Sequence, residues 1–434
     1  MEVSAGSLTY MLDKHFKSSL YVNAIYIMLN SATSAILGFV FWNLMAHHFP
    51  PASVGIASAI VSASGLTSSV GRLGLGTGLT RFVPESGSRG RQMAVAAFWV
   101  GGIASVTASA IYLFGIPVWS PALGALGHNT GFALGFLFLT GATTVGALLD
   151  NGFIAQRAAK YAFWRGFIAS VSRIPLPYLL FAALGGYGIF FDSGIGVVLS
   201  LGVSAVFFFS SVYPKDPIGM GSPFSSLRPM FLFCGSDYLA TLFTSSIGFI
   251  FPIMILNIRG AEESAYFYIA WMIGSVISIV PGAVSHSLVA ESAHCPEQLS
   301  SLVKKSFVLS FGLLIPVIVF LYVLTPWLLG MFGVSYAEQA TPLMRWLLVS
   351  NVPIVANALY SSVNQVKKRL GNIIFQSIAI AGLTITMGLF FVGKYGLAGL
   401  GIGYALGNLV VAVPATVVVW KTMRDGCSKS GPLV

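Results

Sequence analysis

Four ionisable residues interrupt long apolar stretches of this sequence: Arg72, Arg173, Arg345 and Asp237. A charge at the centre of a bilayer costs at least about 2.5 to 3.5 kcal/mol, and the residues that bear this cost usually serve a function. Arginine binds phosphate oxygens through two parallel hydrogen bonds, whereas an aspartate in such a place can carry a proton or a sodium ion. These residue types predict anion binding by the arginines and ion coupling by the aspartate.

Arg173 is the most deeply placed of the four. It lies twelve residues after Tyr161, which corresponds to about 18 Å along a helix and places it close to the middle of a membrane. Pro175 and Pro177 follow it, and a kink there would turn the arginine toward a cavity or a neighbouring helix. The alternative is an arginine that reaches the interface or is satisfied by backbone carbonyls.

The other three positions each admit two interpretations. Arg72 either lines a cavity or extends to the interface near Arg81. Arg345 either anchors the outer end of its helix beside Trp346 or guards an outer mouth. Asp237 either binds a coupling ion or is half-hydrated near the lipid headgroups.

Two asparagines extend this set of candidates. Asn30 in the first predicted span and Asn357 in the tenth could bind hydroxyl-rich cargo. The alternative is a hydrogen bond between helices, which is the commoner fate of a polar side chain in a membrane.

The elements that must position these residues are membrane helices. Hydrophobic residues make up 56% of the chain and charged residues only 8%, whereas soluble domains carry about 25% charge. Apolar stretches of about 20 residues predict an all-α membrane protein with about twelve spans. The predicted spans are 20–46, 52–80, 93–115, 131–152, 161–184, 189–212, 231–257, 264–290, 305–330, 342–363, 371–392 and 396–420.

The spans fall into two similar halves. Gly38-Phe39-Val40-Phe41 returns as Gly248-Phe249-Ile250-Phe251, and Glu85, Gln156 and Gly185 have counterparts in Glu291, Gln365 and Gly393 at nearly constant spacing. Repeats of this kind are common in secondary transporters. Six spans in each half predict two parallel six-helix lobes, 1–212 and 231–434, joined by a cytoplasmic linker, 213–230.

The positive charges predict how the chain is oriented. Eighteen of the 23 lysines and arginines, Arg165 among them, fall on one side of the predicted membrane, two fall on the other, and three lie within spans. Because positive loops remain in the cytoplasm, both termini are expected there, in a multi-pass protein of the inner (cytoplasmic) cell membrane. The net charge of +10 reflects this asymmetry, so no nucleic-acid partner is implied. Asp150 and Asp192 are expected to be lone acids at helix ends.

Motifs for enzymatic chemistry are missing from the sequence. Gly393-Lys394 is followed by Tyr395 and lacks the earlier glycine of a phosphate-binding loop. The metalloprotease and serine-hydrolase motifs and paired carboxylates at useful spacing are also missing, and the three cysteines lack metal-ligand spacing. The sequence predicts a protein that is not an enzyme, with no cofactor and no metal site.

Loose motifs of glycine and hydrophobic residues extend over almost the whole chain. They are Asn30 to Gly38, Gly55 and Leu73 to Glu85; Met331 to Ala337 with Leu343, Arg345 and Leu348; and Tyr187 to Ile189 with the partner stretch Tyr395 to Leu397. These stretches resemble the polysaccharide biosynthesis (Wzx-type, O-antigen) flippases of the multidrug/oligosaccharidyl-lipid/polysaccharide exporter (MOP) superfamily.

The resemblance implies a MATE-like pair of helix bundles around a V-shaped central cavity that opens to each side in turn. The implied cargo is a polyprenyl-diphosphate-linked oligosaccharide, an O-antigen, capsule or exopolysaccharide unit, moved from the cytoplasmic to the outer leaflet. Arg72 and Arg173 would hold the diphosphate, a role assigned by their helix positions. The implied partners are this substrate, membrane lipids, a coupling H⁺ or Na⁺ and a polysaccharide polymerase or other assembly protein.

Three other classes fit part of the pattern. An ion-coupled drug or metabolite exporter of the same superfamily shares the architecture but would favour acidic cavity residues for cationic drugs. A major facilitator also has twelve spans in two halves, although the acid expected before Ser88-Arg89-Gly90-Arg91 is missing. A membrane-embedded glycosyltransferase or polymerase would need a large outer loop and catalytic groups, which the sequence lacks.

Overall fold

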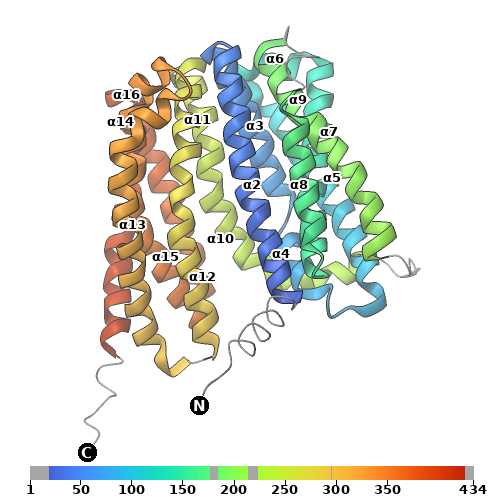
Figure 1. Ribbon diagram of the computed structural model, residues 1–434, viewed down its shortest axis with the longest axis vertical. Helices are drawn as coiled ribbons and strands as arrows, with labels where there is room; N and C mark the ends of the chain where they lie inside the picture. Colours follow the sequence, from blue (N-terminus) through green and yellow to red (C-terminus); the bar gives the residue numbers. More distant parts are fainter. Residues whose placement is uncertain (1–18, 176–183, 214–222, 295, 426–434) are drawn as a thin grey trace, which may run out of the picture. The chain divides into compact units, whose positions relative to one another are not determined.

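The computed structural model describes residues 19–175, 184–213, 223–294 and 296–425, and nearly all of them are helical (Figure 1). These ranges contain no strand, which agrees with the predicted all-α fold. The helices are α2 (Ser19–His48), α3 (Pro51–Gly71), α4 (Leu75–Phe82), α5 (Gly90–Trp119), α6 (Gly124–His128), α7 (Thr130–Ala155), α8 (Ala159–Ser172), α9 (Gly185–Phe207), α10 (Pro223–Ile258), α11 (Ala261–Ser275), α12 (Ile279–His294), α13 (Leu299–Gly330), α14 (Val334–Val349), α15 (Asn351–Val366) and α16 (Leu370–Asp425). Short turns include η6 (Val276–Ser278) and the π-helical η5 (Phe208–Val212).

The described residues contain ten helical stretches that are long and apolar enough to cross a membrane, so the chain is a multi-pass membrane protein. The twelve predicted spans correspond to these stretches and to α8. The longest stretch, α16, holds two of the predicted spans, because Gly396 adopts φ 60° and ψ −145° and divides it into two helices. Helix α8 covers the start of the predicted span 161–184, whose residues 176–183 lie outside the described ranges.

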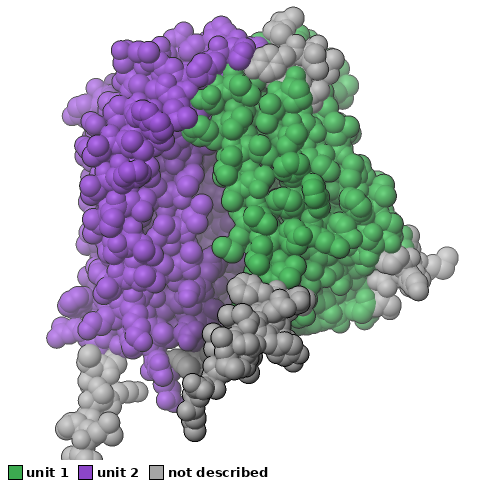
Figure 2. Space-filling model, viewed as in Figure 1, with its two compact units in different colours: residues 1–45, 63–235 green, residues 46–62, 236–434 purple. Residues whose placement is uncertain are grey.

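The chain divides into two compact units, which Figure 2 shows in different colours. Unit 1 comprises residues 1–45 and 63–235, and unit 2 comprises residues 46–62 and 236–434. Residues 46–62 belong to unit 2 because α3 begins against α11: a Cβ added at Gly55 would lie 1.7 Å from the backbone oxygen of Ala261. Helix α10 begins at Pro223, inside the segment expected to be a linker, and residues 214–222 lie outside the described ranges.

The second predicted span is not a single helix. Helix α3 ends at Gly71, and Leu73 and Gly74 follow with φ 50° and φ 75° before α4 begins. Two left-handed residues in succession cannot continue a right-handed helix, and glycine adopts this conformation without a steric cost. The prediction of one helix over 52–80 is therefore wrong. In unit 2 the second span is also interrupted, by the 3₁₀ turn η6 between α11 and α12.

The internal repeat is visible in the backbone. Arg157 after α7 and Lys368 after α15 have φ 55° and φ 56°, an unusual conformation for residues other than glycine. The two turns close with the same hydrogen bond pattern, from Ala158 N to Phe153 O at 2.9 Å and from Arg369 N to Asn364 O at 2.8 Å. The two units therefore share a turn that is built residue by residue in the same way.

Candidate functional sites

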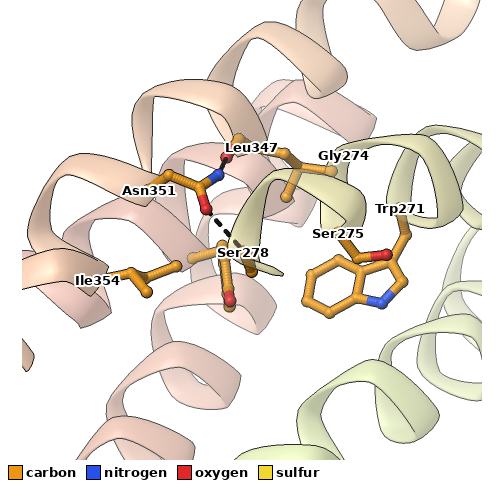
Figure 3. Close-up of a pocket in the computed structure, with 8 residues that line it drawn as sticks. Trp271, Gly274, Ser275, Ser278, Leu347, Asn351 and Ile354 are labelled. Carbon is orange, nitrogen blue, oxygen red and sulfur yellow. Dashed lines mark hydrogen bonds between the residues drawn. The ribbon is translucent and has the colours of Figure 1, made fainter. Parts of the chain in front are cut away.

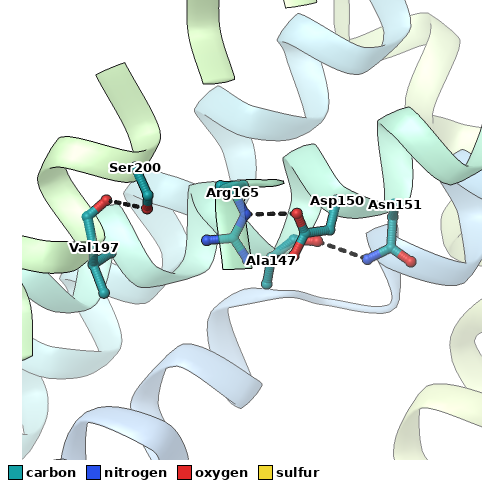
Figure 4. Close-up of polar contacts among 6 residues, drawn as sticks. All are labelled: Ala147, Asp150, Asn151, Arg165, Val197 and Ser200. Atoms are coloured by element: carbon teal, nitrogen blue, oxygen red, sulfur yellow. Dashed lines mark hydrogen bonds and ion pairs between the residues drawn. The ribbon is translucent and has the colours of Figure 1, made fainter. Parts of the chain in front are cut away.

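A buried ion pair stands at the centre of the first candidate site. Arg165 Nε on α8 donates a hydrogen bond to Asp150 Oδ1 on α7 at 2.5 Å, and Arg165 Nη2 donates a second one to Asp150 Oδ2 (Figure 4). The two side chains are only 15% and 18% exposed. Such paired hydrogen bonds between charged groups are among the strongest in proteins.

The ion pair corrects one prediction. Asp150 was expected to be a lone acid, yet it pairs with Arg165 within a helical hairpin. The sequence does hold a signal for the pair. Asp150 lies six residues before the turn at residues 156–158 and Arg165 seven residues after it, and residues at nearly equal distances from a tight turn face each other across antiparallel helices.

Arg72 adds a second positive charge to this site. It lies at the break between α3 and α4, partly buried, and its charge acts on the Asp150 carboxylate. Glycines make room for the cluster: the Cβ position of Gly146 lies 3.1 Å from Arg165 Nη1, and that of Gly76 lies 3.0 Å from Asn151 Nδ2. In the described part of unit 1 this site therefore places two arginine charges near one aspartate.

Arg173 and Asn30 both lie at a different place in unit 1, the interface of α2 with α8. The Arg173 guanidinium lies 5.0 Å from the centre of the Phe41 ring, and its Nη2 lies 3.4 Å from the Cβ position of Gly38. Asn30 Oδ1 lies 2.3 Å from the Cβ position of Gly166. Helix α8 ends at Ser172, shortly before Pro175, as expected for a helix before proline. The structure brings Arg173 and Asn30 to one interface and places Arg72 in another.

The predicted residues of unit 2 are separate from one another. Arg345 on α14 lies over the ring of Tyr322 at 4.7 Å. Asn357 on α15 is 5% exposed, donates to the carbonyl of Asn408 at 3.1 Å and accepts from Gln376 Nε2 at 3.3 Å. Asn357 thus links α15 to both parts of α16, and its amide is committed to hydrogen bonds between helices. The side chain of Asp237 on α10 is exposed.

Unit 2 also contains a pocket of about 30 Å³, room for one or two water molecules. Trp271, Gly274 and Ser275 of α11, Ser278 of η6, Leu347 of α14, Asn351 and Ile354 of α15, and Tyr404 of α16 line it (Figure 3). Ser278 Oγ donates to Asn351 Oδ1 at 3.0 Å, and Asn351 Nδ2 donates to the carbonyl of Leu347 at 2.9 Å. The pocket thus offers aromatic rings and neutral polar groups.

Metal binding has no support in the described part of the chain. No group of three or more His, Cys, Asp or Glu side chains within those ranges is arranged to hold a metal ion.

The fold defines a class of membrane protein. No protein-family model matches the sequence, and no curated protein sequence matches it significantly. Solved structures of MATE family transporters do match over nearly the whole chain, so the predicted MATE-like fold is confirmed.

Three of these structures are informative. One is an inward-facing multidrug resistance MATE transporter of the MOP superfamily, with a TM-score of 0.64, 18% identity and coverage of 93% of this chain and 96% of that one. Another is a MATE protein in complex with MaL6, with a TM-score of 0.60, 17% identity and coverage of 95% and 97%. A third is a MOP superfamily transporter from Pyrococcus furiosus, with a TM-score of 0.59, 18% identity and coverage of 94% and 96%. At this identity the likeness establishes the fold, and the polysaccharide flippase branch stays a prediction.

Proposed function

We propose that this chain is a secondary transporter that exports organic solutes across a membrane by alternating access. The observation that carries the proposal is the shared fold, which covers at least 93% of this chain and 96% of two of the transporters compared above. The sequence has no phosphate-binding loop for ATP, so an ion gradient is the proposed energy source. The proposed location is the inner membrane, with both termini in the cytoplasm, and the proposal assigns the chain no enzymatic activity.

Drug-like organic molecules are the first candidate cargo. One transporter of the same fold is described as a multidrug resistance protein. The residues around the pocket of unit 2 match this class in chemistry, because Trp271 and Tyr404 offer aromatic faces and Ser275, Ser278 and Asn351 offer hydroxyl and amide groups. At about 30 Å³ the pocket has room only for water in this structure, so a drug-sized molecule requires it to open. A few placed polar groups among aromatic rings are typical of sites for small organic molecules.

A lipid-linked oligosaccharide is the second candidate cargo, and the charge of unit 1 favours it. Three arginines of that unit, Arg72, Arg165 and Arg173, outnumber its two buried acids, Asp150 and Asp192, and arginine matches the oxygens of a diphosphate. A polar headgroup cannot cross hydrocarbon unaided, because each unsatisfied polar group there costs several kcal/mol. In this alternative Arg173 holds the diphosphate and Asn30 contacts the sugar, both from the α2–α8 interface of unit 1. Arg72 lies at a different place in that unit, and Asn357 is committed to hydrogen bonds with Asn408 and Gln376, so neither joins them.

One reconstitution tests both cargo classes. The purified protein is placed in proteoliposomes with an imposed ion gradient, and two probes are followed: a fluorescent cationic dye and a fluorescent lipid-linked oligosaccharide. Dye movement above that of empty vesicles, reduced by Asn351→Ala, supports the first class. Sugar movement between leaflets, abolished by Arg173→Ala at unchanged protein abundance, supports the second. If neither probe moves, the transporter proposal is wrong.

A further inference from the structure

Unit 1 contains a second buried acid that the ion pair does not use. Asp192 lies on α9, seven residues from Gly185, or about 10 Å along the helix axis. Its side chain is 1% exposed, and its Oδ1 is buried and makes no hydrogen bond. Asp192 was expected to lie at a helix end, which is wrong, because α9 begins at Gly185 and encloses it.

Close helix packing excludes water from this part of α9. A Cβ added at Gly194 would lie 2.3 Å from Leu139 Cδ1 of α7, and one added at Gly196 would lie 2.6 Å from the backbone oxygen of Ala169 on α8. The two glycines follow Asp192 within about one helical turn and bring α9 against both neighbours. The carboxyl group is therefore held in a tightly packed, dry part of the unit.

The charged groups of the neighbouring helices are engaged elsewhere. On α7 the charged residue is Asp150, which is paired with Arg165 of α8 near the level of Leu201, about 13 Å along α9 from Asp192. Lys160 of α8 lies over the Tyr161 ring at 4.8 Å. Tyr161 in turn stacks on Phe207, so this lysine lies near the far end of α9.

The backbone of a third cation, Arg173, also contacts α9. Its backbone nitrogen lies 3.4 Å from the Cβ position of Gly196, yet its guanidinium extends to Gly38 and Phe41 of α2. The remaining titratable side chain of α9 is the phenol of Tyr187, and η5 contains no charged residue. Among the described residues, no cation or hydrogen-bond donor compensates a negative charge on Asp192.

We infer that Asp192 is a proton-binding site: its carboxyl group holds a proton in this structure and releases it only when water or a cation reaches α9. An ionised carboxylate without a partner in such surroundings costs far more than the neutral acid. Ionisation converts the carboxylic acid to a carboxylate and one free proton, so the charge state of Asp192 is tied to the packing of α9 against α7 and α8. This inference rests on the proposed transport function and identifies the coupling ion as a proton that binds to Asp192.

Infrared spectroscopy tests the proton site without any assay of transport. The protein in lipid nanodiscs at neutral pH is compared with Asp192→Asn, the neutral isostere of the protonated acid. We expect the wild type to show a protonated-carboxyl C=O band that shifts in D₂O and is lost in the variant. Glu338→Gln, which removes an exposed acid of α14, is the matched control and should lose no such band.

If Asp192→Asn folds and the band is unchanged, the inference is overturned. If that variant fails to fold, Asp192→Glu is measured instead. Glutamic acid keeps the protonated carboxyl group but shifts its position, so the frequency of the C=O band must change. An unmoved band in Asp192→Glu also overturns the inference.

Transport then tests the coupling role. In proteoliposomes with a pH gradient and the cationic dye as probe, we expect Asp192→Asn to lose gradient-driven accumulation while the dye still equilibrates down its own gradient. Full gradient-driven accumulation in Asp192→Asn overturns the coupling role. If the wild type moves no dye, the proposed cargo is wrong, whereas the infrared band still decides whether Asp192 binds a proton.

Discussion

The interiors of the two units are built with different chemistry on a repeated backbone. Unit 1 encloses mainly ionisable groups: the Asp150–Arg165 pair, Arg72 beside it, Arg173 over the Phe41 ring and the acid Asp192. Unit 2 has one partly buried arginine, Arg345 over the Tyr322 ring, and otherwise encloses neutral amides that bond to a serine, to each other or to backbone carbonyls: Asn351, Asn357, Gln376 and Asn408.

One matched pair of phenylalanines from the sequence repeat shows the same difference. Phe41 and Phe251 are both fully buried, at 1% and 0% exposure. Phe41 receives the guanidinium of Arg173, whereas Phe251 packs edge-on against Trp271, Phe267 and Tyr404. A duplicated fold thus keeps its helices and turns while the polar groups inside it diverge.

The largest loss of stability is expected when one residue of the buried ion pair in unit 1 is removed. Asp150→Ala strands the Arg165 charge inside unit 1 and should destabilise the protein by about 3 to 5 kcal/mol. Thermal unfolding of the purified protein in detergent measures the loss of stability. The double variant Asp150→Ala/Arg165→Met should recover most of it, because no charge is then left without its partner. A loss no larger than that of Asn357→Ala would contradict the contrast between the units.

A smaller loss is expected in unit 2. Asn357→Ala leaves the Asn408 carbonyl and one bond of Gln376 unsatisfied, and neutral buried groups of this kind cost about 1 to 3 kcal/mol. The same thermal melting measures it, with the exposed Gln339→Ala of α14 as the control that should change little. If Asn357→Ala has no effect, water satisfies the stranded groups and the amide network is not a stabilising element.

The smallest effect is expected where the units are alike. Arg157→Gly and Lys368→Gly each place glycine at a left-handed position, which removes backbone strain of about 1 to 2 kcal/mol from the folded state. Glycine also gives the unfolded chain more conformational freedom, which lowers the free energy of unfolding by about 0.4 to 1 kcal/mol. Both variants should therefore be neutral or slightly stabilising, and by equal amounts. Lys305→Gly, inside α13, should instead destabilise by about 1 kcal/mol. Unequal effects of the first two variants would show that the turns are not equivalent.

Hydropathy predicts most of the fold, because every spanning helix must be apolar over its length. It does not locate the break at Leu73 and Gly74, because the residues on both sides are equally apolar; only the run of glycines from Gly71 to Gly78 points to it. Asp192 was misplaced for a related reason. A predicted start of the span at residue 189 puts this acid near an end, whereas the left-handed Gly185, with φ 57°, is where the helix begins.

The sites were harder to predict than the helices. The Asp150–Arg165 pair is local in sequence, so the positions of the two residues around the turn at residues 156–158 are enough to predict the contact. The pocket of unit 2 gathers Trp271, Asn351 and Tyr404 from helices far apart in the chain, and no sequence pattern joins them. The role predicted for Arg173 is tested by the transport of Arg173→Ala, and the roles predicted for Arg72, Arg345, Asn30, Asn357 and Asp237 stay predictions.

The pairing of α2 with α8 has a consequence for how the protein is made. Asn23 Oδ1 accepts a hydrogen bond from Ala159 N at 2.9 Å, and Asn30 meets Gly166 one heptad later, so the two helices run parallel. The first span emerges from the ribosome 136 residues before its partner, a wait of about 7 to 27 s at 5 to 20 residues per second. Throughout that interval the asparagines of α2 lack their native contacts with α8. The insertion machinery must therefore keep these polar side chains out of the lipid until α8 is made.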